Sequence, residues 1–247
     1  MKRWKLLLAA PLMALLTLSN CVENEDDDDL QLLLFSGAFL AGLNTQYTGP
    51  VFFYQRSNAA FNEYTVSWIS YDTTAFTVNQ DQITLDSIGL NFAVYNNTNL
   101  LITNCSETGA SGGNGALRIY DLSNNNSLTA NLSLGVCPQG IAVNGTNAYI
   151  ALQGNTDGDD SLLVVSLLDL SNPTLTASIT VGEEPQDVFV ANGLVYVANL
   201  DFSDNDNPSI SEINPLTNTV TRTISVGEIA VEFVSSPSVN MFTYNAG

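Results

Sequence analysis

Histidine is absent from the 247 residues of this chain, and basic residues are scarce. The chain therefore lacks the commonest metal ligand and the side chain that most readily serves as a general base near neutral pH. A Ser–His–Asp or Cys–His catalytic site is excluded, as are haem attachment and copper binding that depend on imidazole. Only six lysines and arginines oppose 25 aspartates and glutamates, for a net charge of −19. Because binding to nucleic acid or anionic lipid needs clustered cations, we expect neither partner.

Three of the six basic residues lie in the first five positions, ahead of an apolar run that ends at Leu18. These proportions are typical of an export signal, to which we assign residues 1–20. Cys21 then follows in the order LSNC. This order resembles a bacterial lipoprotein signal, in which the cysteine is acylated after cleavage before it. An ordinary secretory signal or an uncleaved anchor is the alternative, and in each case the chain leaves the cytoplasm.

An acidic segment, VENEDDDD, runs from Val22 to Asp29 and carries six carboxylates. Like charges at this density repel one another, so we expect a solvated tether. The apolar residues that follow, 30–43, are fewer than the roughly 20 needed to cross a bilayer. We expect them to pack on the domain, with a membrane surface or a central channel as alternatives. Residues 21–43 are thus assigned to the tether and a short apolar segment, and residues 44–247 to the folded domain.

Short apolar runs recur at a nearly constant interval through the rest of the chain. A phrase that ends in glycine closes each interval, at Gly89, Gly135, Gly182 and Gly227, with spacings of 46, 47 and 45 residues. This period is typical of a β-propeller with one four-stranded antiparallel blade per repeat. We therefore predict an all-β fold with four to five blades in this chain.

One copy of the repeat, VGEEPQDVFVANGLVYVANL, matches a known pattern position by position. It resembles the YVTN-type β-propeller repeat, which reads roughly VGxxPxxVxV, then a hairpin, then VYVAN. The matching residues are Val181, Gly182, Pro185, Val188, Val190, Tyr196, Val197, Ala198 and Asn199. The resemblance covers about 160 residues and implies the propeller fold of extracellular and periplasmic proteins. It implies no particular chemistry, because propellers carry many unrelated functions.

The two ends of the repeat region do not make a complete ring. Residues 51–56, 64–71 and 76–85 are predicted as the second, third and fourth strands of the first blade, which then lacks its own inner strand. Residues 231–234 and 241–244 are predicted as the first two strands of a fifth blade. Merging these strands into one blade leaves one strand too many. We therefore favour an incomplete arc of a larger propeller.

Two loops rich in Asp and Asn connect strands on one rim of the predicted propeller. They read GNTDGDD and DFSDNDN. Oxygen ligands on such turns suit calcium, and the candidate ligands are Asp157, Asp159, Asp160, Asp201, Asp204 and Asp206. Solvated turns that hold no metal are the alternative, because Asp and Asn are common turn residues.

The remaining cysteines, Cys105 and Cys137, form an even pair in an exported protein. Both fall on the rim that carries the long loops, on neighbouring blades, so a disulfide between blades is expected. Two half-buried thiols are the alternative.

Together these features predict an exported, lipid-anchored binding scaffold that works through an acidic loop rim. The expected location is the outer membrane or cell surface, or the periplasm, with membrane contact through the lipid anchor only. A protein, a glycan or a small molecule is the expected ligand. The alternative is a carboxylate-dependent hydrolase or lactonase-like enzyme, for which no catalytic residue is assigned. An enzyme should bring two or three carboxyl groups with raised pKa values to the channel mouth, whereas a scaffold should scatter acidic residues over the rim.

Overall fold

The computed structural model describes eleven stretches of the chain, and all regular structure in them is β-strand. These stretches are residues 32–33, 51–56, 64–71, 76–85, 88–105, 115–136, 138–154, 160–201, 207–226, 230–235 and 241–245. Within them, no helix is long and apolar enough to span a membrane.

The strands form four sheets of four strands and one sheet of two, and consecutive strands pair in each. The first blade contains β1 (Leu32–Leu33), β2 (Val51–Arg56), β3 (Tyr64–Tyr71) and β4 (Phe76–Leu85). The second contains β5 (Ile88–Tyr95), β6 (Asn99–Cys105), β7 (Gly115–Asp121) and β8 (Ser127–Gly135). The third contains β9 (Pro138–Asn144), β10 (Asn147–Leu152), β11 (Ser161–Ser166) and β12 (Thr174–Thr180). The fourth contains β13 (Pro185–Ala191), β14 (Leu194–Asn199), β15 (Ser209–Asn214) and β16 (Thr219–Ser225), and a hairpin of β17 (Ala230–Ser235) and β18 (Met241–Asn245) follows it.

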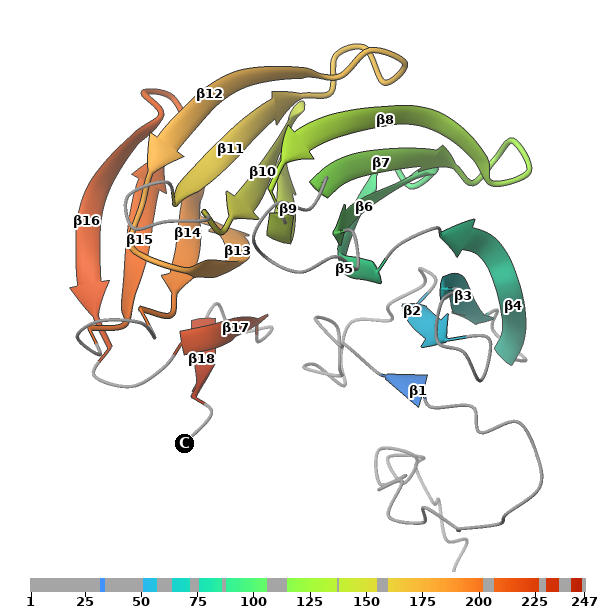
Figure 1. Ribbon diagram of the computed structural model, residues 1–247, viewed down its shortest axis with the longest axis horizontal. Helices are drawn as coiled ribbons and strands as arrows, with labels where there is room; N and C mark the ends of the chain where they lie inside the picture. Colours follow the sequence, from blue (N-terminus) through green and yellow to red (C-terminus); the bar gives the residue numbers. More distant parts are fainter. Residues whose placement is uncertain are drawn as a thin grey trace, which may run out of the picture.

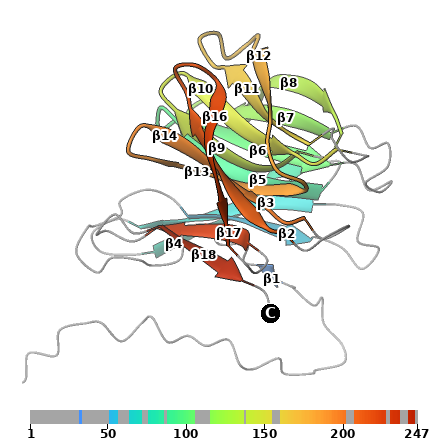
Figure 2. The ribbon, with the colours of Figure 1, turned by 90° about the vertical axis from the view of Figure 1, so that its left-hand side faces the viewer.

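The blades follow one another around an open arc (Figure 1). Strands β5, β9, β13 and β17 line its concave side, and β8, β12 and β16 lie on its convex side (Figure 1). The β17–β18 hairpin packs beside the fourth blade, against β13 and β14 (Figures 1 and 2). It forms a sheet separate from β1–β4, so the described blades do not close into a ring. The predicted all-β architecture of four-stranded antiparallel blades is confirmed.

How strongly a strand is buried depends on its place within the blade. The second strand is buried almost throughout, as in β10, because it lies between two neighbouring blades. The fourth strand is mostly exposed, as in β16, where only Val220 and Ile224 are half-buried, because it lies on the convex edge. Short turns join the strands. In the turn between β13 and β14, Asn192 and Gly193 both have positive φ, which matches a two-residue hairpin.

An irregularity recurs at the same place in four of the five inner strands. Strands β5, β9, β13 and β17 each have a β-bulge near their start, where they pair with the end of the second strand. On these inner strands the register shifts fall between Gly89 and Asn91, Pro138 and Ile141, Pro185 and Asp187, and Ala230 and Glu232. Because the β17–β18 hairpin has the same bulge, it has the register of a blade's first two strands.

The hydrophobic core is divided into layers between successive blades. One cluster fills each interface, from the first and second blades to the fourth blade and β17. Representative fully buried members are Val66 and Ile102, Leu117 and Ile150, Leu162 and Val197, and Ala198 and Phe233. Each blade is therefore stabilised mainly by its two neighbours, as in other repeat proteins.

The structure corrects the prediction that the first blade lacks an inner strand. Leu32 and Leu33 form β1 and pair antiparallel with Gln55 and Tyr54 of β2. The apolar segment thus supplies backbone partners to an edge strand, whose amide and carbonyl groups would otherwise lack strand partners on that side.

Candidate functional site

The candidate site is the loop rim, which we define as the end of the blades that carries the loops β6–β7, β10–β11 and β14–β15 and the connections β8–β9, β12–β13 and β16–β17. Antiparallel pairing places all of these segments at the same end of the strands. In the fourth blade, two of them are joined by backbone hydrogen bonds. The amides of Leu200 and Asp201 donate to the carbonyl oxygens of Glu184 and Glu183, at 3.1 and 3.3 Å. Glu184 and Asp201 have φ of 50° and 47°, so both segments turn sharply where they meet.

Two of the predicted calcium ligands hold the bases of the long loops. Asp160 is 6% exposed, and its Oδ1 accepts a hydrogen bond of 2.8 Å from the amide of Gly154. Asp201 Oδ2 accepts one of 3.2 Å from the amide of Asn207. In each loop the bond joins residues six positions apart, at the two ends of the loop. A carboxylate therefore closes each loop where it leaves the blade.

The other four predicted ligands, Asp157, Asp159, Asp204 and Asp206, lie outside the described residues. Where the structure describes the chain, it brings together no group of three or more Asp, Glu, Cys or His side chains able to hold a metal ion. The second oxygen of Asp201, Oδ1, is buried and has no hydrogen-bond partner among the described residues. Calcium binding by the loops stays a prediction.

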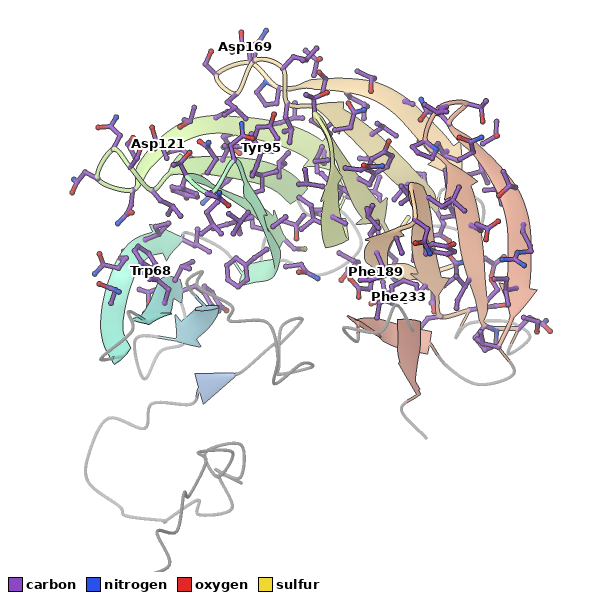
Figure 3. All side chains as sticks on the ribbon, turned by 180° about the vertical axis from the view of Figure 1, so that it is seen from behind. Trp68, Tyr95, Asp121, Asp169, Phe189 and Phe233 are labelled. Atoms are coloured by element: carbon purple, nitrogen blue, oxygen red, sulfur yellow. The ribbon has the colours of Figure 1, made fainter. Side chains whose placement is uncertain are left out.

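A carboxylate that the sequence analysis did not single out links the fourth blade to the hairpin. Asp187 Oδ2 accepts a hydrogen bond of 2.9 Å from the amide of Phe233, and its Oδ1 accepts one of 2.8 Å from Val188. The rings of Phe189 and Phe233 lie next to this link, with centroids 5.9 Å apart (Figure 3). The signal in the sequence was a charged residue within the apolar run PQDVFV, but its partner lies 46 residues away.

A buried amide just below the rim was also missed as a structural residue. The side chain of Asn199 is fully buried. Its Nδ2 donates to Oγ of Ser211 at 3.0 Å and to Oγ and the carbonyl of Ser209 at 3.2 and 3.3 Å. A Cβ placed on Gly182 would come within 2.8 Å of this amide. The glycine and asparagine that recur in the repeat pattern are thus in contact, because the amide packs directly on the connection that enters the blade.

One of the three cysteines lies among the described residues. Cys105 is disulfide-bonded, whereas Cys137 and Cys21 lie outside the described residues. Nearby, Thr103 Oγ1 donates a hydrogen bond of 2.7 Å to the carbonyl of Gln139 on the next blade. The ends of β6 and β9 are therefore held close together beside Cys105. The pairing with Cys137 stays a prediction.

Two carboxyl groups with shifted pKa values lie at the other end of the strands. A hydrogen bond from the Ser123 hydroxyl lowers the pKa of Asp121, and one from the Ser171 hydroxyl lowers that of Asp169. Both aspartates sit in turns that join the third and fourth strands of a blade, on the convex side of the arc (Figure 3). Each carboxylate also accepts the backbone amide of the same serine. Both carboxylates stabilise turns. A carboxyl group that acts as a general acid needs a raised pKa, whereas the pKa values of Asp121 and Asp169 are lowered.

Comparison with known proteins supports the fold and goes no further. No family model and no curated protein matches the chain. A solved structure of hydrazine synthase from Kuenenia stuttgartiensis is similar over 74% of this chain, with a TM-score of 0.54 and 16% identity. This chain spans 47% of that protein's length. A protein described as functionally unknown from Desulfotomaculum acetoxidans has a TM-score of 0.42 and 12% identity over 83% of this chain and 87% of its own. The likeness to the first of these structures and the four-stranded sheets together show that the chain has a β-propeller-like fold.

Proposed function

We propose that this chain is an exported, lipid-anchored β-propeller of the YVTN type that binds a partner through its acidic loop rim. The observation that carries the proposal is the closure of two long acidic loops at their bases by Asp160 and Asp201. A loop held at its base loses less conformational entropy when its tip binds, and preorganisation of this kind raises affinity.

The assignment to the YVTN type is supported by the structural roles of the repeated residues. Gly182 leaves space for the amide of Asn199, and Pro185 pairs with Asn199 at the recurring bulge. The glycine, proline and asparagine of the pattern thus form one structural unit at the rim end of the blade. Because these three residues form one unit, we expect a repeat of this type to contain all three.

Export and anchoring are supported by the order of segments at the start of the sequence. A basic and apolar segment of export-signal proportions precedes Cys21, and six carboxylates in eight residues follow it. An acylated cysteine next to a charged, solvated segment would hold the blades away from the membrane surface. The proposed location is the outer membrane or the cell surface.

Metabolic labelling with a clickable fatty acid tests the anchor. The wild-type chain should incorporate the label and stay in the membrane fraction, whereas the Cys21→Ala variant should be unlabelled and released by a salt wash. Protease treatment of intact cells then separates the cell surface from the periplasm. Equal labelling of both forms would contradict acylation at this cysteine.

The role of the rim can be tested with matched charge variants. Asp157→Asn with Asp159→Asn removes two negative charges from the segment that connects β10 and β11, and Asp121→Asn with Asp169→Asn removes two from the opposite end of the strands. The full-length protein, in detergent, is applied to an array of polysaccharides and cationic peptides. The loop variant should lose most of the binding, and the control should keep it. Equal binding by both variants, or no binding by the wild type, would contradict the proposal.

Calcium titration addresses the metal prediction separately. At low salt, binding by the loop tips should release or absorb heat and raise the melting temperature, and the Asp157→Asn with Asp159→Asn variant should show a weaker effect. An absence of heat together with an unchanged melting temperature would leave these carboxylates as partner-binding or solvated groups.

A further inference from the structure

One set of matched positions differs between the fourth blade and the two blades before it. In each blade, three residues lie side by side on the second, third and fourth strands, on the face that looks toward the next blade. A second register shift, between the third and fourth strands, follows Ile119, Val164 and Glu212 in the three blades and makes the positions comparable. The triplets are Leu101, Ile119 and Ala130 in the second blade, Tyr149, Val164 and Ala177 in the third, and Tyr196, Glu212 and Arg222 in the fourth.

The triplets of the second and third blades are apolar; their second- and third-strand members are buried, and Ala130 and Ala177 on the fourth strands are half-buried. Leu101 and Ile119 are fully buried, and Tyr149 and Val164 are 1% and 2% exposed. The cluster around Tyr149 and Val164 includes Val195 and Val197 of the fourth blade. These positions are therefore where one blade seats the next.

The fourth blade has an ion pair at the same place. Arg222 Nη2 lies 2.6 Å from Glu212 Oε2, and the two side chains are 61% and 13% exposed. Thr221 Oγ1 donates to Glu212 Oε1 at 3.0 Å, and the Tyr196 hydroxyl is a further hydrogen-bond partner of this carboxylate. The carboxylate is thus fully engaged by groups of its own blade. No other charged pair takes the corresponding place in the second or third blade, where the partners are apolar.

The next row of residues on the same face, nearer the loop rim, is apolar and consists of Ala198, Ile210 and Ile224 on the same three strands. Phe233 of β17 is 4% exposed and packs with Ala198 and Ile210, with Phe189 at its edge. The face is therefore divided along its strands into an apolar row, which packs with the hairpin, and the row of Tyr196, Glu212 and Arg222, which carries the ion pair. Outer strands of a further blade laid over this second row would bury the ion pair. Removing such charges from water carries a desolvation penalty that their mutual attraction often fails to offset.

We propose that Tyr196, Glu212 and Arg222 form a polar end face, built to meet solvent and not to seat the outer strands of another blade. The inference rests on the side chains of β14, β15 and β16, and it is independent of what the loop rim binds. Repeat proteins need such a polar face where stacking stops, because an apolar one would associate with other chains. The end face would let the arc remain open without aggregation.

Thiol labelling tests this directly with a matched pair of variants. Arg222→Cys and Ala177→Cys place a cysteine at the same register position in successive blades of the full-length protein. Because thiol reactivity follows exposure, the cysteine at 222 should react with a maleimide on the order of tenfold faster than that at 177, after subtraction of the wild-type background. Ala130→Cys replaces the control if Ala177→Cys does not fold. Equally slow labelling at both positions would overturn the proposal.

A second variant tests the purpose of the charges. Glu212→Val with Arg222→Ala gives the fourth blade the triplet of the third. If the face meets solvent, this variant should self-associate in light scattering at concentrations where the wild type does not. A variant with the wild-type mass and a higher melting temperature would show that the face is covered, and would refute the proposal.

Discussion

Replacement of Asn199 by alanine should destabilise the fourth blade more than any ordinary polar substitution. The side chain is fully buried, and its two amide hydrogens are shared among Oγ of Ser211 and Oγ and the carbonyl of Ser209. Alanine removes these donors from the buried oxygens of Ser209, which water does not reach, whereas Oγ of Ser211 keeps a hydrogen bond of 3.4 Å from the amide of Gly182. Each buried group left without a partner costs about 1–3 kcal/mol, and the lost side-chain volume adds to this.

The expected loss in free energy of unfolding is therefore about 2–4 kcal/mol. For a domain of this size each kcal/mol lowers the melting temperature by about 2–4 °C, so a fall of roughly 5–15 °C is expected. Urea unfolding followed by circular dichroism gives the free energy directly. The slope of the transition should not change, because the same surface is exposed on unfolding. A loss below about 0.5 kcal/mol, the range of exposed substitutions, would refute the assigned role.

Two further variants distinguish the effect of the lost hydrogen bonds on stability from the effect of the lost side-chain volume. Asn199→Asp keeps the volume but places an oxygen where the donors were, so it should be at least as destabilising at neutral pH. Burial raises the pKa of such a carboxyl group, so this variant should regain stability as the pH falls and the protonated form donates a hydrogen bond. Asn131→Ala, at an exposed position on β8, is the control and should change little. Equal effects of Asn131→Ala and Asn199→Ala would show that burial is not the cause.

Three other predictions concern separate contacts. Gly182→Ala should lose about 1–3 kcal/mol, measured by urea unfolding, because the new methyl group meets the amide of Asn199; an unchanged midpoint would contradict the contact. The hydrogen bond from Arg222 lowers the pKa of Glu212, so this pair stabilises the fold above the unfolded pKa near 4.3 and the stability is lost as the pH falls through the lower folded pKa. The difference in melting temperature between wild type and Arg222→Ala should thus be largest above pH 5 and shrink towards pH 3, and a constant difference would argue against the ion pair. Reduction of the Cys105 disulfide should cost about 2–4 kcal/mol, seen as a lower urea midpoint with reductant, and equal midpoints would show that it does not stabilise the blades.

Much of the fold was accessible from sequence because the signals for a blade are local. Alternation of apolar and polar residues placed strands at 51–56, 64–71 and 76–85, the ranges that β2, β3 and β4 occupy. The inner strand of the first blade was not accessible. Only two residues of a long apolar segment pair with β2, and nothing near Leu32 in the sequence indicates that its partner is Gln55. Pairing of this kind depends on the three-dimensional position of an open strand edge.

The candidate site shows the same division. Asp160 and Asp201 lie where strands end, as expected of turn-forming residues. The role of each carboxylate depends on its hydrogen-bond partner in the folded chain. Asp160 accepts the amide of Gly154, and Asp187 accepts the amide of Phe233 in the β17–β18 hairpin. A repeating all-β chain and its strand ends follow from the order of residues, since strand patterning and turns arise from neighbouring residues. Which carboxylates close loops, and that Glu212 and Arg222 stand where the third blade has Val164 and Ala177, depends on the folded arrangement, because bulges shift the register by amounts that only the paired strands reveal.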